Sequence, residues 1–497
     1  MNLSYFDIAI VLVYMVFVFF IGFFVKKYVK GIDDYLVAGR SMGFNLGLIS
    51  LMCTEIGMIT FVYFGELGFK AGFASLIVAI PPLIAFVFLG KTGFITKPLL
   101  EMKIKTIPEF FSIKFSHGVR FYIGVLMAVG GILNFGVFPG VEAKFINVIT
   151  GVPEDYLLVT MVILLTVVLL YTFVGGMVSV IITNYVQYVI LSIGMVLITF
   201  ISFFAIGWNG IVESVTTSMG EKGMNPFYPS IIEAEFGLGF IVWQILMWVA
   251  MLVGWQAVAM RLFSSKDLKT GQKIYKWSGI MFLFRAILPV FWGIIAFGYF
   301  SSLGQDVDSL DSLPLMLREL IPSGLLGLIL AGLLAASMST YASYLLSWSS
   351  IVSQDIVGSI IKFVTGKELD SKKQLVYSKI TMVVVMIFII WWSLFHDMEG
   401  YLYFYLQMTA MLFIPGTFIC FAFGIYWKKA RTLGAYLAIT FAVIPPLLYL
   451  VWPEQAKTYA SELGWGGFVV ALVGMIIGSV IQNIFQPKTE IQKVNYE

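Results

Sequence analysis

The stretch SLMCTEIGMIT at residues 50–60 places a carboxylate, Glu55, and a glycine, Gly57, in the middle of a long apolar segment. An ionisable side chain at that depth in a membrane costs about 2.5–3.5 kcal/mol on insertion scales, so it indicates function. A glycine beside it is a place where a helix can unwind and present its carbonyls to a ligand. The alternative is a neutral, protonated Glu55 packed against another helix. The stretch predicts a broken membrane helix.

Apolar segments of this kind recur along the whole chain of 497 residues. Sixty per cent of the residues are hydrophobic and only 12% are charged, which is too few charges to cover a soluble domain of this size. About 20 apolar residues cross the hydrocarbon core, and backbone in lipid must bond internally, so the segments are helices. We predict an all-α membrane protein with 13 transmembrane helices, at residues 7–25, 43–67, 71–96, 121–149, 156–175, 177–205, 237–260, 277–302, 322–355, 374–395, 400–427, 432–452 and 464–486.

The positive charges predict which way the chain faces. Most of the 31 Lys and Arg residues fall in the gaps after spans one, three, seven, nine and eleven and in the C-terminal tail. The gap after span seven, for example, contains Arg261, Lys266 and Lys269. The positive-inside rule then puts the N-terminus outside and the C-terminus in the cytoplasm. We therefore expect a multi-pass protein of the plasma (inner) membrane, in contact with the lipid bilayer and not with nucleic acid.

Two hydroxyl side chains share one helical face in the span at residues 322–355. Ala336, Ser339 and Thr340 are three and four positions apart, and this spacing aligns residues on a helix. Hydroxyls and carbonyls are hard oxygen ligands that suit a small cation. Equally, Ser and Thr in membrane helices bond their own backbone or allow two helices to approach closely. The pattern alone leaves both readings open.

A second glycine interrupts the span at residues 237–260, where Gly254 precedes Trp255. Interrupted spans in two halves of a chain indicate a central binding site in transporters. Trp255 is predicted to stack on a sugar ring or to face a cation, unless it packs or faces lipid. Arg285 lies deep in a span, where it lines a pocket or snorkels to the interface. Glu142 and Lys144, near the outer end of span four, are read as interfacial.

The chain offers no arrangement of residues that indicates an enzyme. Its two histidines, His117 and His396, lie in a gap and at a span end, and no hydrolytic triad or metal cluster suggests itself. No gap is long enough for an ATPase domain. We therefore expect no catalytic residues, and any energy source must be an ion gradient or the gradient of the solute itself.

Several short motifs occur in a fixed order along nearly the whole chain. They are Asp34-Tyr35 with Ala38-Gly39-Arg40, Thr106-Ile-Pro-Glu-Phe110, Gly175-Gly176 with Thr183, Asn184 and Gln187, Leu334-Ala-Ala-Ser-Met-Ser339-Thr340, Pro415-Gly416, and Gly424-Ile-Tyr-Trp-Lys428-Lys429 with Gly434-Ala435. In order and spacing this set resembles the sodium:solute symporter family, which includes sodium/glucose, sodium/proline and choline transporters.

The resemblance implies a fold like that of the bacterial leucine transporter, with two inverted five-helix repeats. The first repeat would be residues 43–205 and the second residues 237–427. An extra helix and cytoplasmic loop at 1–42 would precede them, an extracellular loop at 206–236 would join them, and two extra helices and a short tail at 428–497 would follow. No internal repeat is obvious in the sequence itself.

The resemblance also implies a sodium site. Matched residue by residue, this site falls on the carbonyls of Cys53, Ile56 and Ala336 and on the hydroxyls of Ser339 and Thr340. Sodium is accordingly the expected coupling ion.

The position of Asn184 corresponds to the ion-exit path on the cytoplasmic side. Many members of the family carry an aspartate there, so this chain departs from the pattern at a residue concerned with ion release.

The solute site matches the family only in part. Glu55 stands where proline transporters have an aspartate and sugar transporters an asparagine, Gln407 stands where sugar transporters have a glutamine, and Arg285 stands near their pocket lysine. We add Thr60 and Trp255 as solute-binding candidates. Glu55 with Arg285 would suit a zwitterion such as an amino acid, whereas Trp255 would suit a quaternary amine or a sugar ring.

The expected function is sodium-coupled symport of a small polar organic solute, such as a sugar or an amino acid, into the cell by alternating access. A choline-like organic cation or a carboxylate is the alternative solute. An uncoupled uniporter or channel, or a membrane sensor, is the alternative class.

Overall fold

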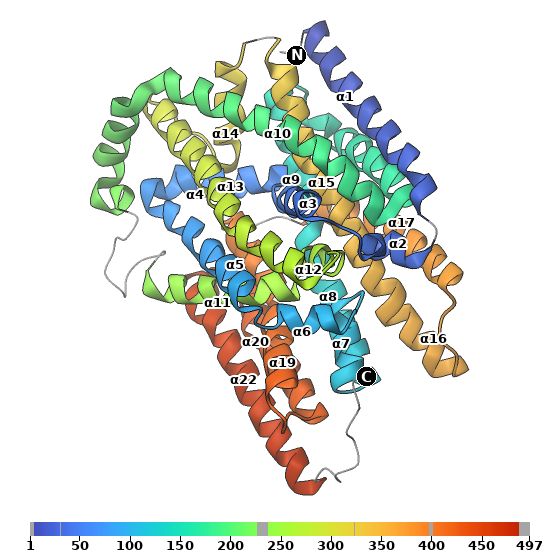
Figure 1. Ribbon diagram of the computed structural model, residues 1–497. Helices are drawn as coiled ribbons and strands as arrows, with labels where there is room; N and C mark the ends of the chain where they lie inside the picture. Colours follow the sequence, from blue (N-terminus) through green and yellow to red (C-terminus); the bar gives the residue numbers. More distant parts are fainter. Residues whose placement is uncertain (1–3, 30, 226–236, 323, 397–400, 487–497) are drawn as a thin grey trace.

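The computed structural model describes residues 4–29, 31–225, 237–322, 324–396 and 401–486. Within these ranges the regular elements are helices, apart from one isolated bridge between Met42 and Ser265 (Figure 1). The prediction of an all-helical protein is therefore confirmed for the part of the chain that is described.

The helices have the following bounds, where η5 is a π-helix and the other η elements are 3-10 helices: α1 (Tyr5–Phe24), η1 (Val25–Tyr28), α2 (Ile32–Val37), η2 (Ala38–Arg40), α3 (Phe44–Glu55), α4 (Met58–Ala71), η3 (Gly72–Ala79), α5 (Ile80–Thr92), α6 (Thr96–Glu101), α7 (Ile107–Lys114), α8 (His117–Gly136), α9 (Phe138–Thr150), η4 (Glu154–Tyr156), α10 (Leu157–Met224), α11 (Leu238–Gly254), α12 (Gln256–Phe263), α13 (Leu268–Ser302), α14 (Ser309–Leu320), α15 (Leu326–Ile351), η5 (Val352–Val357), α16 (Gly358–Thr365), α17 (Ser371–Phe395), α18 (Leu402–Met411), α19 (Ile414–Tyr426), α20 (Thr432–Val451), α21 (Pro453–Ala456), η6 (Lys457–Tyr459) and α22 (Ala460–Phe485).

Eight helical segments in the described residues are long and apolar enough to cross a membrane, and up to ten if each of two bent pairs counts as one span. The chain is thus a multi-pass membrane protein. The count of 13 spans stays a prediction, because breaks and bends divide several of the expected segments into shorter helices.

The predicted helix break in the stretch at residues 50–60 is confirmed. Helix α3 ends at Glu55, and Ile56 and Gly57 have the non-helical torsion angles φ −102°, ψ 75° and φ −85°, ψ 165° before α4 begins at Met58. The second predicted break is confirmed as well, because α11 and α12 meet at Trp255 with a bend of 54°. Helices α18 and α19 form a third bent pair, with an angle of 42°.

Helix α10 includes almost all residues of the two spans predicted at 156–175 and 177–205 and part of the loop predicted at 206–236. Its 68 residues contain non-helical backbone at Gly176, Gly207 and Gly220, each with positive φ. Gly176 lies at the junction expected between spans five and six. Figure 1 shows the green end of α10 turning sharply at the side of the molecule. The part of the expected loop at 206–236 that belongs to α10 is therefore helical except at Gly207 and Gly220, and residues 226–236 lie outside the described residues.

Helix α15 forms the centre of the protein. In the apolar stretch of the helical segment Leu326–Thr365, which begins with α15, 94% of the residues are buried. In the apolar stretch of α17 the buried share is 28%. Helix α15 packs against α1, α3, α8, α10 and α17. A helix that is enclosed on all sides in this way has no lipid-facing stripe, so its serine and threonine hydroxyls point toward protein.

Helices α4 and α13 approach each other so closely that the contact requires glycine. A Cβ atom on Gly293 would overlap the backbone carbonyl of Gly65, and one on Gly68 would overlap the carbonyl of Val290. Small residues at such crossings let two membrane helices pack backbone to backbone. This contact fixes α4, the second half of the broken helix, against the long helix α13.

We expect Gly293→Ala to lower the melting temperature clearly, because overpacking a well-packed contact costs about 1–3 kcal/mol or more. The control is Gly466→Ala in α22, where an added methyl group meets nothing within 4 Å and improves helix propensity. The measurement is the temperature at which the purified protein loses its main peak in size-exclusion chromatography. Equal melting temperatures for the two variants would contradict the importance of this crossing.

Candidate functional site

The end of α3 crosses the middle of α15, and backbone carbonyls meet hydroxyls there. The Ser339 hydroxyl lies 2.7 Å from the carbonyl oxygen of Cys53 and 2.8 Å from that of Ala336. The Thr340 hydroxyl donates to the carbonyl of Thr54 at 3.1 Å. All of these residues are buried. The structure therefore brings together four of the five residues predicted to bind sodium.

Ile56, the fifth, lies in the non-helical link directly after α3. The last carbonyls of a helix lack partners within that helix and carry a partial negative charge, which attracts cations. Ser339 has one hydroxyl proton and two carbonyl oxygens within hydrogen-bond distance, so three oxygens converge at this point and each has a lone pair that can face a cation. A small hard cation satisfies several such oxygens at once. The residues present thus fit the predicted ion.

The described residues of this region do not have the side chains of a transition-metal site. The described residues contain no group of three or more His, Cys, Asp or Glu side chains placed to hold a metal ion. Neutral carbonyl and hydroxyl oxygens are weak ligands for soft or strongly Lewis-acidic metals and suit alkali or alkaline-earth cations.

A buried arginine, Arg261, is linked to this crossing through the hydroxyl group of Ser343. It was not among the site residues predicted from the sequence. The Arg261 guanidinium donates to the Ser343 hydroxyl at 2.5 Å, and that hydroxyl lies 3.0 Å from the one of Thr54. Arg261 is fully buried in α12. Arg261 directly follows predicted span seven, and its guanidinium is enclosed by protein there.

A small cavity of about 50 Å³ adjoins the crossing, and its lining contains all five predicted solute-binding residues. Those residues are Glu55, Thr60, Trp255, Arg285 and Gln407. Thr54 and Thr340, which belong to the crossing of α3 and α15, line the same cavity. The two candidate sites therefore share a wall.

Arg285 points into the protein rather than toward the interface. Its Nε donates to the backbone carbonyl of Glu55 at 2.6 Å, and its Nη2 donates to the Tyr63 hydroxyl at 2.8 Å. The guanidinium lies 4.9 Å from the centre of the Phe282 ring and 5.6 Å from that of Trp248. The sequence allowed Arg285 either to line a pocket or to snorkel to the interface, and in the structure it lines a cavity.

Trp255 belongs to an aromatic cluster at the bend between α11 and α12. Its ring stacks on Phe413 with centroids 5.7 Å apart, and Trp348 and Tyr344 approach edge-on at 5.1 and 5.6 Å. Only 1% of the residue is exposed. Trp255 thus packs through one face while it also lines the cavity.

Asn184 lies on α10 beside the first half of the broken helix. Its side-chain nitrogen is 3.3 Å from both the carbonyl and the hydroxyl oxygen of Ser50, one turn before Cys53 in α3. The residue is fully buried. The predicted ion-exit residue therefore contacts the helix that carries the candidate ion ligands.

Glu142 is not interfacial, contrary to its reading from sequence. The side chain is fully buried in α9, and one carboxylate oxygen accepts a hydrogen bond from the backbone nitrogen of Ile59 at 2.8 Å. The other accepts from the hydroxyl of Ser337 in α15. Lys144, by contrast, is half-exposed and pairs with Asp311 at 2.9 Å. Glu142 caps α4, because a negative charge is favourable at a helix N-terminus.

Two sets of contacts join polar segments that the charge pattern predicts to lie on the same side of the membrane. In the first set, Arg40 donates to the carbonyls of Ile104 at 3.2 Å and Phe263 at 3.1 Å, which joins the gaps after spans one, three and seven. Lys144, near the predicted outer end of span four, pairs with Asp311 in the gap after span eight at 2.9 Å. Loops that contact one another lie at the same end of the molecule.

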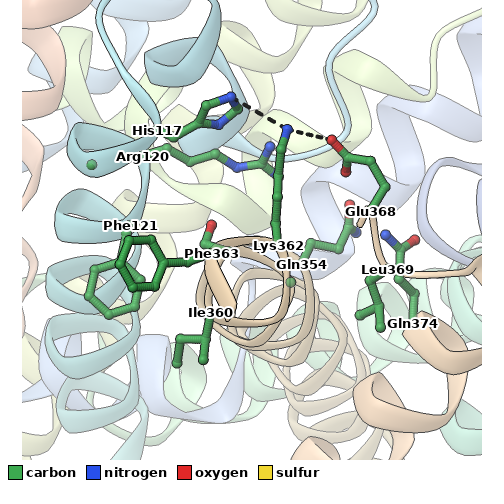
Figure 2. A pocket seen from close by; sticks show the side chains of 13 residues that line it. His117, Arg120, Phe121, Gln354, Ile360, Lys362, Phe363, Glu368, Leu369 and Gln374 are labelled. Atoms are coloured by element: carbon green, nitrogen blue, oxygen red, sulfur yellow. Dashed lines mark hydrogen bonds and ion pairs between the residues drawn. The ribbon is translucent and has the colours of Figure 1, made fainter. Parts of the chain in front are cut away.

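A second, larger cavity of about 480 Å³ lies between α8, α16 and the start of α17 (Figure 2). There the Nζ atom of Lys362 lies 3.5 Å from Nε2 of His117 and 2.5 Å from Oε1 of Glu368. The hydrogen bond from Lys362 lowers the pKa of Glu368. No predicted site residue lines this cavity, and Arg120 on its wall is paired with Asp355 at 2.7 Å. The size of a cavity is therefore no guide to function here.

The sequence profile of the sodium:solute symporter family matches residues 35–441, so the chain belongs to the sodium:solute symporter family. Its members are sodium-coupled transporters and not enzymes, and the resemblance inferred from the motifs is confirmed.

Relatives with curated names are moderately similar. The sodium/glucose cotransporter 4 of Danio rerio is 27% identical over 90% of this chain and 71% of its own length. The sodium/glucose cotransporter of Vibrio parahaemolyticus is 25% identical over 93% and 88%. The human sodium/myo-inositol cotransporter is 26% identical over 86% and 64%.

Solved structures share the fold. A sodium-coupled sialic acid symporter in a substrate-bound outward-open state superposes with a TM-score of 0.80 over 96% of this chain and 98% of its own, at 17% identity. Mhp1, a nucleobase-cation-symport-1 family transporter, superposes with a TM-score of 0.58 over 92% and 96%, at 16% identity.

Proposed function

We propose that this protein is a secondary active transporter that carries a small polar organic solute into the cell together with sodium. The observation that supports this most directly is the crossing of α3 and α15, where the hydroxyl of Ser339 lies within 2.8 Å of two backbone carbonyls. The proposed ion ligands are the carbonyls of Cys53, Ile56 and Ala336 and the hydroxyls of Ser339 and Thr340.

The proposed coupling follows from the wall that the two sites share. Thr340 takes part in the crossing and also lines the cavity, and Glu55 ends the same helix whose carbonyls face the ion. Sodium bound there fixes the end of α3, and with it the position of Glu55 and of the Arg285 side chain bonded to its carbonyl. Each ligand then favours the conformation that the other needs, which is positive linkage.

The direction and site of transport complete the proposal. The N-terminus is outside and the C-terminus in the cytoplasm of the plasma (inner) membrane, and residues 43–205 and 237–427 form the two inverted repeats that alternate access. Asn184 lies on the path by which sodium leaves toward the cytoplasm. A membrane potential adds about 2.3 kcal/mol per charge per 100 mV to uptake.

The proposal is tested by measuring influx of radiolabelled sodium into proteoliposomes that contain the purified chain. The expected result is that one class of solute, added outside, raises sodium influx, and that replacing sodium by potassium abolishes uptake of that solute. Solute uptake that is the same in both salts would indicate a uniporter or channel instead. Solute binding without any flux would indicate a sensor.

A further inference from the structure

We infer that the solute is a small zwitterion of the amino-acid type, which places its carboxylate at Arg285 and its ammonium group at Glu55 and Gln407. This inference rests on the proposed function and narrows it to a class of substrate. Its starting point is a set of buried polar atoms in the wall of the small cavity that the protein itself leaves without partners.

Three of these atoms decide the chemistry. Nη1 of Arg285, Oε1 of Glu55 and Oε1 of Gln407 are buried and have no hydrogen-bond partner among the described residues. All three residues line the same cavity. Buried polar groups are normally satisfied, so unsatisfied ones that converge on a cavity indicate a ligand with complementary groups. For these three atoms the complement is an acceptor for Nη1 and donors for the two oxygens; the indole nitrogens of Trp248 and Trp255, unpartnered in the same lining, call for further acceptors.

The acceptor must carry a negative charge to match Arg285. The guanidinium is held in place through Nε and Nη2, at 2.6 and 2.8 Å from oxygens of Glu55 and Tyr63, and Nη1 remains for the ligand. A hydrogen bond that joins two charged groups is roughly twice as strong as a neutral one. A quaternary amine such as choline has no anionic group for this position and brings a second positive charge beside the guanidinium.

The donors match an ammonium group. Glu55 and Gln407 offer only acceptor oxygens at the unpartnered positions, and an ammonium group has three N–H donors. A buried carboxylate and a buried guanidinium are each costly without a counter-charge. Arg285 and Arg261 act on the Glu55 carboxylate through space, but Arg285 bonds only the backbone carbonyl of Glu55, and Oε1 has no hydrogen-bond partner. A zwitterion would supply a charged hydrogen-bond partner to each of the two groups.

A sugar fits this cavity less well, even though the named relatives are sugar and inositol cotransporters. A neutral polyol would offer only uncharged hydroxyl groups to Nη1 of Arg285 and Oε1 of Glu55. One face of Trp255, the residue best suited to stack on a sugar ring, is covered by Phe413 at 5.7 Å.

The first test measures thermal stabilisation of the purified full-length chain in sodium or potassium chloride, with each of the twenty L-amino acids, D-glucose, myo-inositol and choline. For the best amino acid, the amide that lacks the carboxylate and the hydroxy acid that lacks the ammonium group are added. We expect sodium-dependent stabilisation by an amino acid, and binding that is weakened about tenfold or more by removal of either charged group.

The other outcomes separate the inference from the proposed function. Sodium-dependent stabilisation by glucose or inositol, with none by any amino acid, would overturn the zwitterion and leave the symporter intact. Equal binding of choline or of the hydroxy acid would overturn it too. Stabilisation by an amino acid that ignores sodium would leave the zwitterion intact and contradict coupling. No stabilisation by any of the twenty amino acids would overturn the inference.

The second test assigns the contacts. Glu55→Gln is expected to reduce the preference for the amino acid over its hydroxy acid from about tenfold or more to less than about threefold, because Glu55 no longer offers a charge to the ammonium group. Arg285→Gln is expected to do the same for the preference over the amide. Lys144→Gln, far from the cavity in an exposed ion pair, is the control and should keep both preferences. Unchanged preferences in both site variants would overturn the assignment.

Discussion

The double variant Ser339→Ala, Thr340→Ala is expected to lose sodium-dependent transport while the protein still folds. Both hydroxyls lie within 3.1 Å of carbonyl oxygens at the end of α3, where the proposed ion binds. A hydrogen bond to a charged group contributes about 1.5–3 kcal/mol, and loss of two comparable contacts to the ion predicts a sodium affinity about 100-fold lower or worse. The measurement is the shift of melting temperature against sodium concentration in the absence of solute.

Ser350→Ala is the matched control for this experiment. Ser350 is a buried serine of the same helix, and its hydroxyl donates at 2.7 Å to the carbonyl of Ser347 within that helix. Its removal should leave the sodium titration unchanged. A double variant that is stabilised by sodium at wild-type concentrations would rule out the crossing of α3 and α15 as the ion site.

Some of this architecture could be predicted because its signal is local. Gly57 follows an ionisable residue in an apolar segment, and Gly254 precedes Trp255 in another, and the helices break at both places. The offset between Ser339 and Thr340 and the preceding Ala336 likewise follows from the helical repeat. These features need only the residues of one segment, and the family pattern added which two segments meet.

Other features depend on which residues from distant parts of the chain contact a side chain, and the sequence alone does not show these contacts. Glu142 reads as interfacial because it lies near a span end, whereas in the structure it is buried against the N-terminus of α4. Arg261 reads as one of the positive charges that flank an apolar span, but its burial in α12 and its bond to Ser343 follow only from the fold. In both cases residues of other helices decide the environment.

Glu142→Ala is expected to destabilise the protein and to weaken sodium binding together. The carboxylate is the acceptor for the backbone nitrogen of Ile59, at 2.8 Å, and for the hydroxyl of Ser337, so it joins α9, α4 and α15. Leaving two buried donors without an acceptor costs about 1–3 kcal/mol each. Because α4 begins directly after the link that contains Ile56, a displaced α4 also moves the carbonyls at the end of α3.

Two further variants distinguish the capping of α4 by Glu142 from a general effect of removing a charge in this part of α9. Glu142→Gln keeps one acceptor oxygen and should lie between wild type and Glu142→Ala in both melting temperature and sodium affinity. Lys144→Gln breaks an exposed ion pair two residues away, which contributes about 0–1 kcal/mol, and should change neither. If Glu142→Ala melted like Lys144→Gln and bound sodium like wild type, α4 would have to be held by its other contacts, among them the glycine crossing with α13. The ion site would then be independent of α9.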